Sequence, residues 1–133
     1  MFWTLVFLVA CGSDPTVTTP ESVLEQVVSL RSDLSLDDFA KVYGESTLLI
    51  DVRTPEEFKN GRVPGARLVP MTELTPSHPA IVSHPKAEPI YLICHSGGRS
   101  ARAADTLATA GFRTVNVLGG TAAWVKSGRE VER

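Results

Sequence analysis

The chain has 133 residues, a formal net charge of −2 and 43% hydrophobic residues, which is typical of one soluble globular domain with a modest core. The basic residues are scattered, with no lysine- or arginine-rich run that alternates with aromatic residues, so we expect no nucleic-acid partner. The two cysteines lie far apart, and no cysteine or histidine pair has zinc-ligand spacing. We therefore expect neither a metal site nor another cofactor.

The first ten residues, 1–10, are almost wholly apolar, and Cys11 follows them directly. A run of this length is too short to span a bilayer as a helix but suits the hydrophobic region of a signal peptide. Residues 8–11 (LVAC) resemble the lipobox of bacterial lipoproteins, although no lysine or arginine precedes the run. We expect 1–10 to be a signal peptide and Cys11 to carry a lipid on the periplasmic side of a membrane. By the same resemblance, Gly12 after the cysteine favours sorting to the outer membrane. The alternative locations are the periplasm, as a soluble protein, and the cytoplasm. The apolar N-terminus would then be frayed or form a buried first strand.

The next segment, 11–33, is expected to be a tether. Its first part is rich in Ser, Thr, Asp and Pro and has no apolar period, whereas 22–31 is either a short leading helix or more of the tether. The folded domain is placed at 34–133. Its first helix is capped by Ser35 and ends at Gly44.

Short apolar runs then alternate with helical patterns. Strands are expected at 47–52, 66–69, 89–93 and 114–118, helices at 54–58, 100–110 and 121–127, and a surface loop with four prolines at 75–89. This alternation predicts an α/β fold, with a central, mostly parallel sheet of about five strands and helices on both faces. Ligands bind such sheets at the carboxyl ends of the strands.

The segment 94–100 (CHSGGRS) lies between a predicted strand and the following helix. Its glycines allow the backbone to fold tightly, so that the N–H groups of the loop and of the helix N-terminus turn inward. Arg99 adds a full positive charge. A thiol at Cys94 should therefore ionise readily, and the same loop should hold an anion. The alternative, a buried inert cysteine, would leave these glycines and the arginine without a purpose.

Several segments in order resemble the rhodanese domain, over about residues 34–128. They are LIDVR at 49–53, EEF at 56–58, GRVPGA at 61–66, CHSGGRS at 94–100 and LGG at 118–120, followed by Trp124. The resemblance implies a rhodanese-like fold and a sulfurtransferase of the thiosulfate type. In this family the cysteine thiolate takes a sulfane sulfur from a donor such as thiosulfate. The resulting persulfide passes it to a thiophilic acceptor, cyanide or a thiol.

The resemblance also implies roles for single residues. Cys94 is the expected nucleophile, and Arg99 is expected to hold the anionic donor and the departing sulfite. Asp51 and Arg53 are expected to brace the loop rather than to act in catalysis. Apart from the resemblance, Glu56 and Glu57 are expected to interact with the dipole of the helix that they begin. The remaining loop residues are expected to bind the substrate, with His95 as a specificity element: His95, Ser96, Gly97, Gly98 and Ser100.

The implied partners are a small-molecule sulfur donor and acceptor, with a protein acceptor as a further option and membrane contact only through the lipid. Two other functions stay open. Some rhodanese-like domains are non-catalytic binding or regulatory modules, but these commonly lack the cysteine that this chain retains. A cysteine-dependent phosphatase or arsenate reductase is disfavoured because only four residues separate Cys94 from Arg99, whereas those enzymes use a longer loop.

Overall fold

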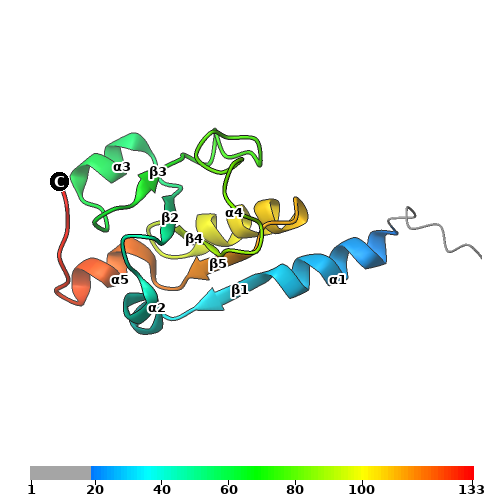
Figure 1. Cartoon of the computed structure of the whole chain (residues 1–133). Coiled ribbons are helices and arrows are strands. Elements are labelled where there is room, and N and C mark those ends of the chain that lie inside the picture. Colours follow the sequence, from blue (N-terminus) through cyan, green and yellow to red (C-terminus); the bar gives the residue numbers. More distant parts are fainter. Residues whose placement is uncertain (1–18) are drawn as a thin grey trace, which may run out of the picture.

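The computed structural model describes residues 19–133, so the predicted signal peptide and Cys11 lie outside the described residues. Five strands form one sheet in the order β1-β5-β4-β2-β3, and every neighbouring pair is parallel (Figure 1). The strands are β1 (Arg31–Leu34), β2 (Leu48–Asp51), β3 (Arg67–Leu68), β4 (Ile90–Ile93) and β5 (Thr114–Val117). The helices are α1 (Pro20–Leu30), α2 (Leu36–Val42), α3 (Pro55–Asn60), α4 (Gly98–Thr109) and α5 (Gly120–Lys126). The predicted α/β fold with a five-stranded sheet is confirmed.

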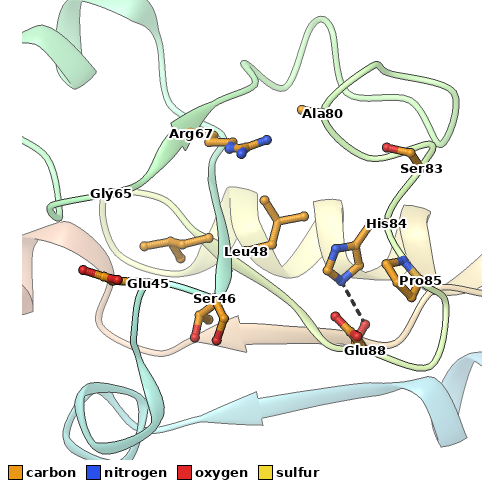
Figure 2. Close-up of a pocket in the computed structure, with 12 residues that line it drawn as sticks. Glu45, Ser46, Leu48, Gly65, Arg67, Ala80, Ser83, His84, Pro85 and Glu88 are labelled. Carbon is orange, nitrogen blue, oxygen red and sulfur yellow. Dashed lines mark hydrogen bonds between the residues drawn. The ribbon is translucent and has the colours of Figure 1, made fainter.

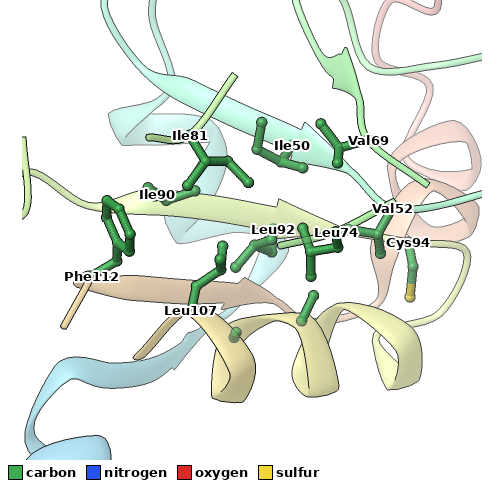
Figure 3. Close-up of a cluster of buried hydrophobic side chains, with 12 residues drawn as sticks. Ile50, Val52, Val69, Leu74, Ile81, Ile90, Leu92, Cys94, Leu107 and Phe112 are labelled. Atoms are coloured by element: carbon green, nitrogen blue, oxygen red, sulfur yellow. The ribbon is translucent and has the colours of Figure 1, made fainter. Parts of the chain in front are cut away.

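Helices cover both faces of the sheet, because alternate side chains of its central strands point to opposite sides. Ile90 and Leu92 of β4 are fully buried in a core cluster that includes α4 (Figure 3). Ile93 points the other way and packs with Phe39 of α2 and Trp124 of α5. Contacts between α1 and α4 and between α2 and α5 complete the two outer layers. Among residues 19–133, no helix is both long and apolar enough to cross a membrane.

The edge strand β1 is the main departure from the sequence prediction. Residues 31–33, which we expected to end the tether, instead pair in register with β5. The sequence of β1 (RSDL) has no apolar run, because an edge position leaves its side chains partly or fully exposed. The preceding segment is helical, as one of our two alternatives held, and Thr19 caps α1 by accepting from the Ser22 N–H.

The loop with four prolines, 75–89, forms turns without a regular helix or strand, as predicted. It is more than a surface loop, however, because the side chain of Ile81 is fully buried. Together with the preceding Leu74, Ile81 completes the core cluster on the α4 side of the sheet (Figure 3). The loop therefore contributes to the core on this side of the sheet, where Ile81 lies near Ile90 at the start of β4 (Figure 3).

Candidate active site

Cys94 directly follows β4 and lies at the carboxyl edge of the sheet (Figure 3). Gly97, with φ of 111°, adopts the left-handed conformation that glycine tolerates and turns the chain into α4. Its backbone N–H donates to the Cys94 Sγ at 3.0 Å. The helix begins at Gly98, two residues before the predicted start at Ser100, so the loop closes directly onto the helix N-terminus.

Hydrogen bonds from the loop favour the ionised form of Cys94. The residue is only 1% exposed, and this burial raises the pKa of the thiol. The Ser100 hydroxyl, 3.3 Å from the sulfur, and the backbone N–H groups of Ser100, Gly97 and Ser96 act in the opposite direction. Together they outweigh burial, and the pKa of Cys94 lies below its ordinary value.

The first turn of α5 holds the loop from the other side. The backbone N–H of Thr121 donates to the Cys94 carbonyl at 2.8 Å, and that of Ala122 donates to the His95 carbonyl at 3.0 Å. Gly120 has φ of 60°, and a Cβ on it would lie 2.5 Å from the Cys94 carbonyl oxygen. A glycine is therefore required here by both backbone conformation and space.

Asp51 and Arg53 form a buried ion pair at the end of β2. The Arg53 Nη2 donates to the Asp51 carboxylate at 2.7 Å, and the two side chains are 5% and 0% exposed. Arg53 also donates to the backbone carbonyls of Glu57 and Gly61, at 3.3 and 2.8 Å. The pair thus fixes α3 and the turn that follows it. Its link to the 94–100 loop runs through α3, since neither side chain has a direct hydrogen bond to that loop in the described structure.

Glu57 and Arg99 make a bidentate ion pair between α3 and the start of α4. The Arg99 Nη1 and Nη2 donate to the two Glu57 carboxylate oxygens at 2.8 and 2.9 Å. These hydrogen bonds hold the pKa of Glu57 at about 2 and raise the pKa of Arg99. Glu57 also completes a capping box with Thr54. It is therefore more than the helix-dipole partner we expected, because it fixes the loop arginine.

The pH dependence of stability tests the Glu57–Arg99 pair. Folding lowers the pKa of Glu57 from 4.5 to about 2, so the pair's contribution is complete above pH 4.5 and is lost as the pH falls toward 2. At pH 7 we expect Glu57→Gln to reduce the free energy of unfolding by about 0.5 kcal/mol, since the pair is partly exposed. In urea titrations below pH 4.5, the difference in the free energy of unfolding between this variant and wild type should shrink. A difference that stays constant down to pH 2, or that Glu56→Gln reproduces, would contradict this assignment.

Two hollows border the Glu57–Arg99 pair. One, of about 300 Å³, is lined by Glu57, the exposed His95 and Thr121, among others. The other, of about 260 Å³, is lined by Arg99 and Met71, among others. Small molecules therefore have space beside the loop. Among residues 19–133, no group of three His, Cys, Asp or Glu side chains is placed to hold a metal ion.

A separate cavity of about 340 Å³ lies at the opposite edge of the sheet (Figure 2). Its lining includes Leu48, the first residue of β2, together with Arg67, His84 and Glu88. Because all strands are parallel, the amino end of β2 lies far from the carboxyl edge that carries Cys94. This cavity takes no part in the candidate active site.

The structure thus groups most of the predicted site residues. Gly97 and Ser100 contact the sulfur, Gly98 begins α4, and His95 and Ser96 are exposed beside it. Three contributors were not predicted for their roles. These are Glu57, Gly120 and Asn116, whose amide oxygen accepts from the Ser100 hydroxyl at 2.6 Å. The one sequence signal for Asn116 is its place as an amide side chain within the segment predicted to be a strand, of which the structure buries 114–117.

A thiol loop that closes onto a helix at the carboxyl edge of a parallel sheet defines an α/β domain with a cysteine whose pKa is lowered by its own loop. The chain belongs to the family of the rhodanese-like domain, whose model matches residues 35–127. It is 38% identical over 85 residues to a protein of Allochromatium vinosum named "Sulfurtransferase", covering 63% of this chain and 77% of that one. It is 39% identical over 89 residues to thiosulfate sulfurtransferase 16, chloroplastic, of Arabidopsis thaliana, covering 59% and 74%. The crystal structure of a rhodanese-like domain protein from Staphylococcus aureus aligns with a TM-score of 0.63 and 32% identity, over 77% of this chain and 99% of that one.

Proposed function

We propose that the protein transfers a sulfane sulfur from a donor such as thiosulfate to a thiophilic acceptor, through a persulfide on Cys94. The observation that carries this proposal is the Cys94 sulfur itself, which is buried and has a pKa lowered by hydrogen bonds from the surrounding loop. Relatives named as sulfurtransferases support the same class of reaction.

In the first half-reaction, the Cys94 thiolate attacks the outer sulfur of thiosulfate. A bond forms between the two sulfurs, the bond between the outer sulfur and the sulfite group breaks, and sulfite leaves with the electron pair. The persulfide keeps one negative charge, which the backbone N–H groups of the loop are oriented to stabilise. Because these backbone N–H groups are in place before the reaction, the loop backbone need not rearrange when the negative charge moves from the Cys94 sulfur to the outer sulfur.

In the second half-reaction, cyanide or a thiolate attacks the outer persulfide sulfur and the Cys94 thiolate leaves. Arg99 binds the anionic donor and the departing sulfite. It can do so because its two hydrogen bonds to Glu57 use only part of its five N–H donors. Thiosulfate and cyanide are small enough for the hollows beside the loop. A protein acceptor would reach the sulfur past the exposed His95.

Steady-state kinetics test this proposal. With thiosulfate and cyanide varied together, we expect parallel double-reciprocal lines, because sulfite leaves before cyanide reacts. Hydrolysis of p-nitrophenyl phosphate serves as the second assay and should stay at background. Phosphate-ester hydrolysis without sulfur transfer would favour the phosphatase alternative. The absence of both activities with every sulfane donor would favour a binding module.

A further inference from the structure

The hydroxyl of Ser100 has more acceptors than hydrogens. It carries one hydrogen, yet its oxygen lies 2.6 Å from the Asn116 Oδ1, 3.2 Å from the Gly97 carbonyl oxygen and 3.3 Å from the Cys94 sulfur. Asn116 offers the shortest contact by 0.6 Å, and an amide oxygen is a stronger acceptor than a neutral thiol. With a neutral Cys94, the hydrogen therefore points to Asn116 and away from the sulfur.

The orientation of the Asn116 amide follows from its second contact. Its Nδ2 donates to the Asp33 carboxylate at 3.1 Å, and an ionised carboxylate only accepts. Asp33 is ionised, because hydrogen bonds from Arg31 and Asn116 outweigh its partial burial and lower its pKa. The amide oxygen must therefore face Ser100. A chain of contacts runs from the edge strand β1 through β5 and α4 to the sulfur.

We propose that Asn116, with its carboxamide oriented by Asp33, is a positioning residue that draws the Ser100 hydroxyl hydrogen away from Cys94 until the thiol ionises. The inference rests on the proposed function, in which Cys94 is the nucleophile. On ionisation the thiol proton passes to water. The Ser100 hydroxyl then turns to donate to the thiolate and gives up its bond to Asn116.

The charged groups around the sulfur are paired among themselves. Arg99 of α4 is held by Glu57 of α3, which is the main cause of its raised pKa, and the Cys94 thiolate adds to that rise. Asp51 of β2 is held by Arg53. Neither pair contacts Ser100 or Asn116 through a hydrogen bond in the described structure. A change at Asn116 therefore acts on the sulfur through the Ser100 hydroxyl.

The test measures the pKa of Cys94 from the pH dependence of its alkylation by iodoacetamide. It uses the full chain with Cys11→Ser, which leaves Cys94 as the one thiol. Asn116→Leu removes the competing acceptor without leaving space for a water, and we expect about fivefold more thiolate at pH values below the pKa. Ser100→Ala removes the donor and should reduce the thiolate about tenfold. The double variant should match Ser100→Ala alone.

Two further variants keep the test decisive. Asn116→Val also removes the acceptor and suits a buried strand, so the thiolate fraction should again rise, and this variant decides if the leucine variant does not fold. Thr114→Ala removes another buried hydroxyl of β5, which bonds to the Ala104 carbonyl at 3.0 Å, and should leave the thiolate fraction unchanged.

An unchanged or reduced thiolate fraction in Asn116→Leu, or an increase that persists when Ser100 is alanine, would overturn the proposal. So would an unchanged or reduced fraction in Asn116→Val. Alkylation needs no sulfur transfer, so a failure of the proposed function would show separately as an inactive protein with the expected thiol pKa values.

Discussion

Replacing Cys94 with serine should reduce thiosulfate:cyanide turnover by at least about a thousandfold, because no other group at the site can accept a sulfane sulfur. A serine hydroxyl is not ionised near neutral pH and forms no persulfide. The fold should survive, since the hydroxyl is smaller than the thiol and can take over the hydrogen bond from the Gly97 N–H. Initial rates and thermal unfolding of the same preparation measure both effects.

The control is the same substitution at the second cysteine of the chain. Cys11→Ser should retain the full wild-type turnover, since Cys11 has no part in the proposed chemistry. Substantial turnover in Cys94→Ser, or its loss in Cys11→Ser alone, would show that Cys94 is not the sulfur carrier.

The second large effect concerns stability and the buried ion pair beneath α3. Arg53→Met should reduce the free energy of unfolding by about 3–5 kcal/mol, because it leaves a buried carboxylate without its partner. The substituted side chain also leaves the carbonyls of Glu57 and Gly61 without a donor. Urea unfolding at neutral pH measures the loss.

Two comparisons separate this effect from a general loss of positive charge. Lys41→Met breaks an exposed pair with Asp38 and should leave stability unchanged. The double change Asp51→Leu with Arg53→Met removes both charges and should recover much of the loss. A small effect of Arg53→Met, or no recovery in the double variant, would mean that the pair does not stabilise the domain as its burial indicates.

The central elements of the fold could be predicted because the types of their side chains match their burial in the core. β2 and β4 are buried and contain apolar runs, β5 is buried and mostly β-branched, and α4 carries small residues on the side that packs against the sheet. The edge strand β1 could not be predicted, because an edge position does not require an apolar run. Ile81 was missed for a related reason: a proline-rich segment indicates a loop but not where that loop packs.

The residues of the candidate site also fall into those that the sequence could predict and those that it could not. Cys94, Gly97 and Ser100 were predictable, because neighbours along one short loop act together. The roles of Glu57 and Asn116 depend on partners 42 and 16 residues away in the sequence. No local pattern connects such residues, and only the fold, which places α3 and β5 beside the start of α4, brings them to the loop.

The mass of the intact protein after incubation with thiosulfate tests the central claim most directly. Wild type should gain the mass of one sulfur atom, lose it on addition of cyanide with release of thiocyanate, and show no gain when Cys94 is serine. A wild-type protein that gains no sulfur from thiosulfate or any other sulfane donor, or a Cys94→Ser variant that gains one, would contradict a Cys94 persulfide.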